Sequence, residues 1–249
     1  MMRILLVLFV LLLTACGGGQ AVAPIGSSGY TNKAKVSKTK APYIYKVKKG
    51  DTLYSISWRY SMDYKTVAKI NNIRSPYKIF IGQKLRFKST KKATQTTKTK
   101  TATTKKKTTT KKVVKKNNTS TWSSKQSVAW RWPTTGKVIS TYSKSAAGRK
   151  GINIAGKSGQ QIVSAAAGKV VYSGNGLARY GNLLIIKHND VYLSAYAHNK
   201  KLLVKDGQWV KAGQKIATLG RTGTQRDQLH FEIRRNGKPI DPMQFLPKR

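Results

Sequence analysis

Two histidines in the C-terminal half of the chain, His198 and His230, belong to the residue type that most often binds metals or transfers protons near neutral pH. Apolar and polar residues alternate from 228 to 234, which predicts a strand with Gln228 and His230 on one face. If Tyr196 and His198 share a face of a neighbouring strand, then His198, Gln228 and His230 converge. The residues therefore predict a polar groove that carries two histidines.

The motifs around this groove resemble those of LytM-type (M23) cell-wall metallopeptidases. That family holds zinc with an HxxxD pair and the second histidine of HxH, while a YxH histidine and the first HxH histidine assist the attacking water. Here Arg149 and Asn153 stand at the HxxxD positions, and Gln228 stands at the first HxH position. By this resemblance His230 is a retained ligand, His198 is a retained catalytic histidine, and the other three are lost positions.

We therefore expect no metal, no cofactor and no catalytic residue, because two of the three usual protein ligands are missing. At about 5 Å, Arg149 would oppose each unit of cation charge by about 3 kcal/mol at an effective dielectric near 20. Rescue by His188 and Asp190 is unfavourable, since both belong to a different strand end. The domain is expected to bind and regulate rather than cut. A zinc endopeptidase with a variant site stays open as an alternative.

Short strands punctuated by glycine must position these residues. Strand patterns cover residues 136–142, 168–173, 182–188, 191–198, 214–219 and 228–234. No long helical pattern competes, so residues 130–249 are predicted to form an all-β antiparallel domain, the degenerate LytM domain. The candidates that line its groove, as a site for a protein partner, are Tyr142, Arg149, Asn153, Tyr180, His198, Gln228 and His230.

Residues 43–88 show a different pattern, with a short strand, two short helices and a closing strand within 79–87. Asp51 or Thr52 can cap the first helix. The β-α-α-β order, the GDTL turn and the IGQKL ending resemble a LysM module, which implies a small α+β fold that binds glycans such as peptidoglycan. Leu53 and Ile81 are also expected to build its core. The resemblance gives as glycan-binding residues Gly50, Asp51, Thr52, Leu53, Asn71, Ile79 and Gly82.

The N-terminus predicts export. A basic start precedes an unbroken apolar run from Ile4 to Leu13, which suits a signal peptide and is too short for the roughly 20 residues of a membrane span. The small residues before Cys16, the only cysteine, resemble a bacterial lipobox. Residues 1–15 are thus expected to be a signal peptide, Cys16 the lipidated residue, and residues 16–42 a flexible tether. By the same resemblance, Gly17 favours the outer membrane.

The formal net charge is +42, a value that invites a nucleic-acid hypothesis. The export signal argues against nucleic acid, and much of the charge lies in a lysine- and threonine-rich segment at 89–129. Between Ser89 and Thr121 there are eleven lysines, thirteen threonines and no acidic residue. Such a segment cannot bury enough apolar surface to fold, so we expect a disordered linker.

The combination of signal peptide, LysM module, linker and degenerate LytM domain resembles septal murein hydrolase activators of the NlpD type. That resemblance implies an outer-membrane lipoprotein that faces the periplasm, binds peptidoglycan and docks an N-acetylmuramoyl-L-alanine amidase during cell separation. A structural tether between the outer membrane and the wall remains as a further alternative.

Overall fold

The computed structural model describes residues 41–88, 127–145 and 149–249. The expected signal peptide, Cys16 and most of the two expected tethers lie outside the described residues. Within the described residues, no helix is long and apolar enough to cross a membrane.

The small module has the predicted β-α-α-β order. Its elements are β1 (Ile44–Lys46), α1 (Leu53–Arg59), α2 (Tyr64–Ile70) and β2 (Lys84–Arg86). The two strands pair antiparallel, with Tyr45 opposite Leu85. The closing strand is shorter than the 79–87 pattern, because turns precede it: Gly82, at a φ of +85°, donates its N–H to the Val47 carbonyl.

Local capping explains where the two helices begin. Thr52 and Ser55 form a reciprocal capping box at the start of α1, and the Asp63 side chain accepts from the Lys65 amide at the start of α2. Leu53 is 1% exposed and lies in the module's apolar core, as expected. The expectation for Ile81 was wrong: this side chain is 71% exposed, since it sits in the turn that precedes β2.

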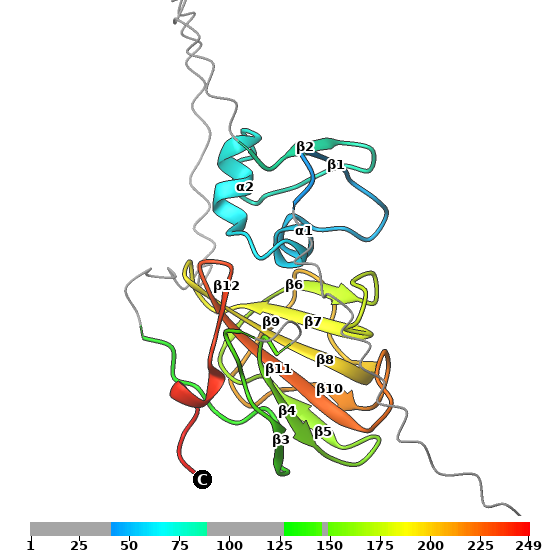
Figure 1. Ribbon diagram of the computed structural model, residues 1–249, viewed down its shortest axis with the longest axis vertical. Coiled ribbons are helices and arrows are strands. Elements are labelled where there is room, and N and C mark those ends of the chain that lie inside the picture. Colours follow the sequence, from blue (N-terminus) through cyan, green and yellow to red (C-terminus); the bar gives the residue numbers. More distant parts are fainter. Residues whose placement is uncertain (1–40, 89–126, 146–148) are drawn as a thin grey trace, which may run out of the picture. The chain divides into compact units, whose positions relative to one another are not determined.

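The large domain is all-β and antiparallel, as predicted. Figure 1 shows its strands side by side in one curved sheet, which has ten strands within the described residues. The main path runs β3-β4-β11-β8-β7-β6-β9, while β5, β10 and β12 pair beside it. The bounds are β3 (Val138–Ser140), β4 (Ile152–Ala155), β5 (Gln161–Val163), β6 (Gly168–Gly174), β7 (Asn182–Lys187), β8 (Tyr192–Leu202), β9 (Trp209–Val210), β10 (Lys215–Leu219), β11 (Gln228–Arg235) and β12 (Lys238–Ile240), followed by the 3-10 turn η1 (Pro242–Gln244).

Six of these strands coincide with the predicted patterns, and four were not predicted: β4, β5, β9 and β12. Each of the four has between two and four residues, too few to show alternation along the chain. The strand β12 also contains Pro239, which disfavours a central strand but is tolerated at an edge. Of the four, β4 matters most, because it lies directly beside β11.

Strand β11 is buried on both faces. Leu229, Phe231 and Ile233 belong to the larger apolar cluster of the domain. The opposite face of the sheet adjoins a second cluster, in which residues of β6, β7 and β8 pack with Trp58 of α1 and Tyr64 of α2. Both faces of the sheet are therefore covered, one by the domain's own core and part of the other by the small module.

Candidate functional site

The pairing of β4 with β11 brings together positions that were predicted to line a groove. Asn153 lies directly opposite His230 in the register. His230 Nδ1 is hydrogen-bonded to Asn153 Oδ1 at 2.7 Å. The structure therefore brings together two of the positions identified from the sequence, although no strand was predicted for the segment that carries Asn153.

The other nitrogen of His230 faces a buried carboxylate. Its Nε2 lies 3.1 Å from Glu232 Oε1, which also accepts from the Tyr180 hydroxyl at 2.7 Å. Glu232 Oε2 accepts from Arg234 Nε at 2.9 Å, and both of these charged side chains are fully buried. A continuous hydrogen-bonded network thus runs from Asn153 through His230 and Glu232 to Arg234.

Glu232 is charged because its polar partners lower its pKa more than burial raises it. Burial alone would raise the pKa of Glu232, but the charge of Arg234, together with the hydrogen bonds from His230 and Tyr180, lowers that pKa to about 2. Burial and the Glu232 charge in turn raise the pKa of the Tyr180 hydroxyl well above its usual range. Glu232 is therefore an anion at neutral pH, and Tyr180 is a neutral donor.

His198 reaches the groove by a different route from the one expected. Tyr196 points into the apolar core, where its ring lies 5.3 Å from that of Phe231. The expectation that Tyr196 and His198 share a face was wrong, because the β7–β8 register shifts near His198, whose φ is +67°. This irregularity turns the His198 ring to within 6.0 Å of the His230 ring. The predicted convergence of the two histidines is therefore confirmed.

His198 is fixed and largely shielded from solvent. Its Nδ1 is 2.8 Å from the Thr222 carbonyl oxygen. Burial, with a smaller contribution from the nearby His230, lowers the pKa of His198. The ring is therefore held neutral more readily than a free histidine, which suits a hydrogen-bonding group in a groove.

The remaining groove candidates lie at different depths. Gln228 is buried, and its side-chain amide donates to Thr224 Oγ1 at 3.1 Å. The Tyr142 hydroxyl donates to the Pro239 carbonyl at 3.2 Å, which places it toward β12. Arg149 is exposed in the segment before β4.

The groove does not fit a catalytic zinc ion. Of the expected ligand positions only His230 carries a metal-binding side chain, and its Nδ1 is already hydrogen-bonded to Asn153 Oδ1 at 2.7 Å. Asn153 supplies a neutral amide, and Glu232 is already paired with Arg234. In the described part of the chain, no three His, Cys, Asp or Glu side chains gather as metal ligands. The residues present therefore support no chemical step through zinc.

His188, which was considered as a rescue ligand, has a structural role. Its ring nitrogens meet the Ala167 carbonyl at 2.8 Å and Ser194 Oγ at 2.7 Å. Burial lowers its pKa to about 4. The partner Asp190 pairs with Lys187 at 2.8 Å, at the turn between β7 and β8. Both residues are thus engaged away from the groove.

The candidate glycan-binding residues of the small module divide into structural and accessible groups. Leu53 is in the core, and the Asn71 amide ties α2 to β2 through the Arg86 backbone in both directions, at 2.8 and 2.7 Å. Gly50 is exposed at a φ of +81°, as its turn requires. The half-buried candidates are Asp51, Thr52, Ile79 and Gly82.

Sequence reasoning missed two features. Strand alternation over 228–234 puts Glu232 and Arg234 on the same face as His230, but their spacing was not interpreted. A carboxylate two residues from an arginine on one strand face is a usable signal for an ion pair. Trp58 was also missed, since it falls outside the apolar stripe of α1 and its partner lies far away in the chain.

The fold and the groove define a protein that combines a LysM module with an M23-type β domain. The chain matches the family described as Peptidase family M23 over residues 147–242 and the LysM domain over residues 45–88.

Curated relatives extend the match over most of the chain. It is 40% identical to the Lipoprotein NlpD/LppB homolog of Pseudomonas aeruginosa, covering 96% of this chain and 89% of that protein. It is 41% identical to Murein hydrolase activator NlpD of Escherichia coli, and the match covers 82% of this chain and 68% of that protein. It is 45% identical to the uncharacterized lipoprotein YgeR of Escherichia coli, and the match covers 89% of this chain and 87% of that protein. The chain therefore belongs to the NlpD/LppB family.

Proposed function

We propose that this protein is a non-catalytic activator of a murein hydrolase, specifically an N-acetylmuramoyl-L-alanine amidase, which it docks in the metal-free groove. The observation that carries the proposal is the pairing of His230 Nδ1 with the neutral Asn153 amide at 2.7 Å, at a position where a zinc site would need a second metal ligand. A relative at 41% identity is named a murein hydrolase activator, which supports the same function.

The groove has the chemistry of a docking site for a peptide segment. His198, His230 and Gln228 supply polar side chains that are at most 9% exposed, and Arg149 supplies an exposed positive charge before β4. Arginine is common among the residues that anchor a partner, and charged groups help to orient it. A partner that binds one conformation of the amidase more tightly than the other shifts its equilibrium by that difference in affinity.

The LysM module directs the activator to peptidoglycan in this proposal. Phe80 and Ile81 are both 71% exposed and adjoin the candidate residues Ile79 and Gly82. Exposed apolar side chains beside a polar turn suit the faces of sugar rings. The match to the LysM family supports glycan binding, and the individual residues remain predictions.

We further propose lipidation at Cys16 and anchoring in the outer membrane with the domains in the periplasm. Relatives named as lipoproteins support the anchor, and one of them is the outer membrane antigenic lipoprotein B of Haemophilus influenzae. In this arrangement the tethers allow the groove to reach septal wall where amidases act during cell separation.

The test is dye release from labelled peptidoglycan by residues 17–249, with and without a purified zinc amidase. Release only in the presence of both proteins supports the activator. Release by the chain alone, abolished by a chelator, would favour the variant zinc peptidase. No release under any condition, with several amidases tried, would favour the structural tether.

Groove variants locate the activity. Arg149→Glu reverses an exposed charge before β4, and Asn153→Trp places a bulky side chain beside His230. Each should abolish activation while thermal unfolding shows that the domain is still folded. Lys137→Glu, a matched charge reversal at an exposed position before β3, should activate normally. Normal activation by a folded Arg149→Glu or Asn153→Trp protein would refute docking in this groove.

A further inference from the structure

Trp58 links the LysM module to the groove-bearing sheet. The Arg234 guanidinium stacks over the Trp58 ring at 3.5 Å, and Arg234 Nη1 donates to the Trp58 carbonyl at 2.7 Å. Trp58 is only 3% exposed, yet it belongs to the apolar cluster of the sheet and not to the core of its own module. The burial of this large side chain therefore depends on the large domain.

Backbone contacts extend the same interface. Thr52 Oγ1 donates to the Val171 carbonyl at 3.1 Å, and Arg59 Nη2 donates to the Gly176 carbonyl at 3.3 Å. A Cβ at Gly237, in the β11–β12 turn, would lie 2.3 Å from the Met62 carbonyl oxygen. The absence of a side chain at Gly237 permits this close approach.

The covered surface is continuous with the groove. Ala197 lies opposite His230 on the neighbouring strand and belongs to the apolar cluster that Trp58 and Tyr64 complete. A hydrogen-bonded path also joins the two sites, from the Trp58 carbonyl through Arg234 and Glu232 to His230. The position of the module and the geometry of the groove are thus physically connected.

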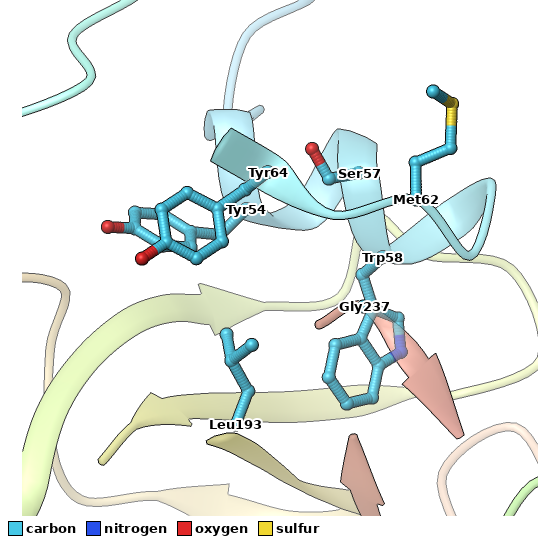
Figure 2. Close-up of a pocket in the computed structure, with 7 residues that line it drawn as sticks. All are labelled: Tyr54, Ser57, Trp58, Met62, Tyr64, Leu193 and Gly237. Atoms are coloured by element: carbon cyan, nitrogen blue, oxygen red, sulfur yellow. The ribbon is translucent and has the colours of Figure 1, made fainter. Parts of the chain in front are cut away.

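Some buried polar groups at this interface lack hydrogen-bond partners. Ser57 Oγ and the Tyr64 hydroxyl are buried there and have no hydrogen-bond partner among the residues that the structure describes. Figure 2 shows Trp58 pointing from α1 toward the strands near Gly237, with Ser57 and Tyr64 around the pocket. Buried polar groups without partners favour exposure to water, so they lower the free-energy difference between this closed arrangement and an open one.

We propose that the LysM module is a reversible cover on the groove-bearing face, and that glycan binding opens it. The proposal rests on the activator function proposed above. Thr52 is a candidate glycan contact and also donates to the sheet, so its hydroxyl cannot serve both partners in the same way. A glycan strand that recruits this turn favours the open form, in which the amidase gains access to the sheet face beside His230. Linkage then requires that opening variants bind glycan more tightly.

The first experiment weakens the cover in residues 17–249, which contain both modules and no cysteine. Trp58→Ala removes the stacked ring and leaves the module's own core intact. The variant should then reach half-maximal amidase activation at a roughly tenfold lower concentration than the unmodified protein. It should also bind chitohexaose about tenfold more tightly. Trp209→Ala, at a tryptophan that is 54% exposed outside this interface, is the matched control and should leave both values unchanged.

The second experiment locks the cover. Lys65 and Asp190 pair across the interface at 3.6 Å, with both side chains partly exposed. The double variant Lys65→Cys/Asp190→Cys, joined by a reducible bis-maleimide, should lose activation and bind chitohexaose weakly. Reduction should restore both.

Equal activation and equal chitohexaose affinity in the locked, reduced and Trp58→Ala proteins would overturn the cover. If no form activates an amidase but chitohexaose affinity follows the predicted order, the cover stands and the proposed activator function fails. If the locked form activates normally, the activator function stands and the cover fails.

Discussion

The two faces of strand β11 are both buried, but by different means. Leu229, Phe231 and Ile233 are fully buried among other apolar side chains, where exclusion of water is sufficient. On the opposite face, Glu232 and Arg234 are equally buried, but each of their polar groups meets a partner. The apolar face tolerates many combinations of residues, whereas the polar face depends on specific partners contributed by distant segments.

The largest expected effect comes from restoring ligands to the polar face. Arg149→His/Asn153→Asp returns the HxxxD pair, which together with His230 makes three protein ligands. The Glu232 carboxylate at Nε2 would then orient His230 from behind, as outer partners of metal-bound histidines do. We expect stoichiometric zinc after dialysis, measured by inductively coupled plasma mass spectrometry.

Two controls accompany the zinc measurement. The unmodified chain should retain none, and adding His230→Ala to the double variant should abolish retention. If the double variant is folded but binds no zinc, then restoring the ligands is not sufficient for zinc binding. The site would then differ from that of the peptidases in more than its ligand residues.

Breaking the buried ion pair should destabilise the domain strongly. Arg234→Ala leaves Glu232 buried without its cation and should cost about 3 to 5 kcal/mol in the free energy of unfolding. Urea denaturation monitored by circular dichroism gives the value. Replacing both partners, as Glu232→Leu/Arg234→Met, should cost less, because no charge is left unpaired. A double variant as unstable as Arg234→Ala would show that lost packing with Trp58, not charge, is responsible.

Acid should weaken the fold in two pH windows. The pKa of His188 falls from 6.5 to about 4 on folding, so the unfolded chain binds a proton first and stability declines as pH drops from 6.5 to 4. The pKa of Glu232 is about 2 in the fold against an ordinary 4.5, so its contribution is complete above 4.5 and is lost toward 2. The free energy of unfolding should change by roughly 3 kcal/mol at most across each window.

Unfolding free energies measured against pH would separate these two groups. His188→Gln should reduce the decline in the upper window and leave a part that comes from His198, whose pKa burial also lowers. Glu232→Gln should remove the decline in the lower window. A profile for His188→Gln with an unchanged decline between 6.5 and 4 would contradict the role of His188.

The smallest expected effect concerns the pairing of Asn153 with His230. Asn153→Ala removes the 2.7 Å hydrogen bond to His230 Nδ1 and should lower the free energy of unfolding by about 1 kcal/mol. Gln228→Ala, which loses a longer bond to Thr224, is the comparison and should cost no more. Thermal unfolding of the two variants measures the difference. A cost near zero for Asn153→Ala would mean that water replaces the amide.

Much of the fold could be predicted from the sequence where a pattern repeats locally. The first helix of the LysM module follows from Thr52 as its cap, and β11 follows from its alternation. The short β4 could not be predicted, since four residues show no period and the strand is defined by its partner. The face of His198 was misassigned because a single irregularity in β8 reverses strand alternation.

The sequence by itself determined which chemical groups are available: two histidines, an asparagine and an arginine where metal ligands would stand, and a module suited to glycans. It also determined the strand that holds His230, because alternation is local. Only the tertiary structure decided that His230 lies between Asn153 and Glu232, and that Trp58 stacks on Arg234 across 176 residues of chain. Such contacts depend on which distant segments share a surface, and no local pattern encodes that.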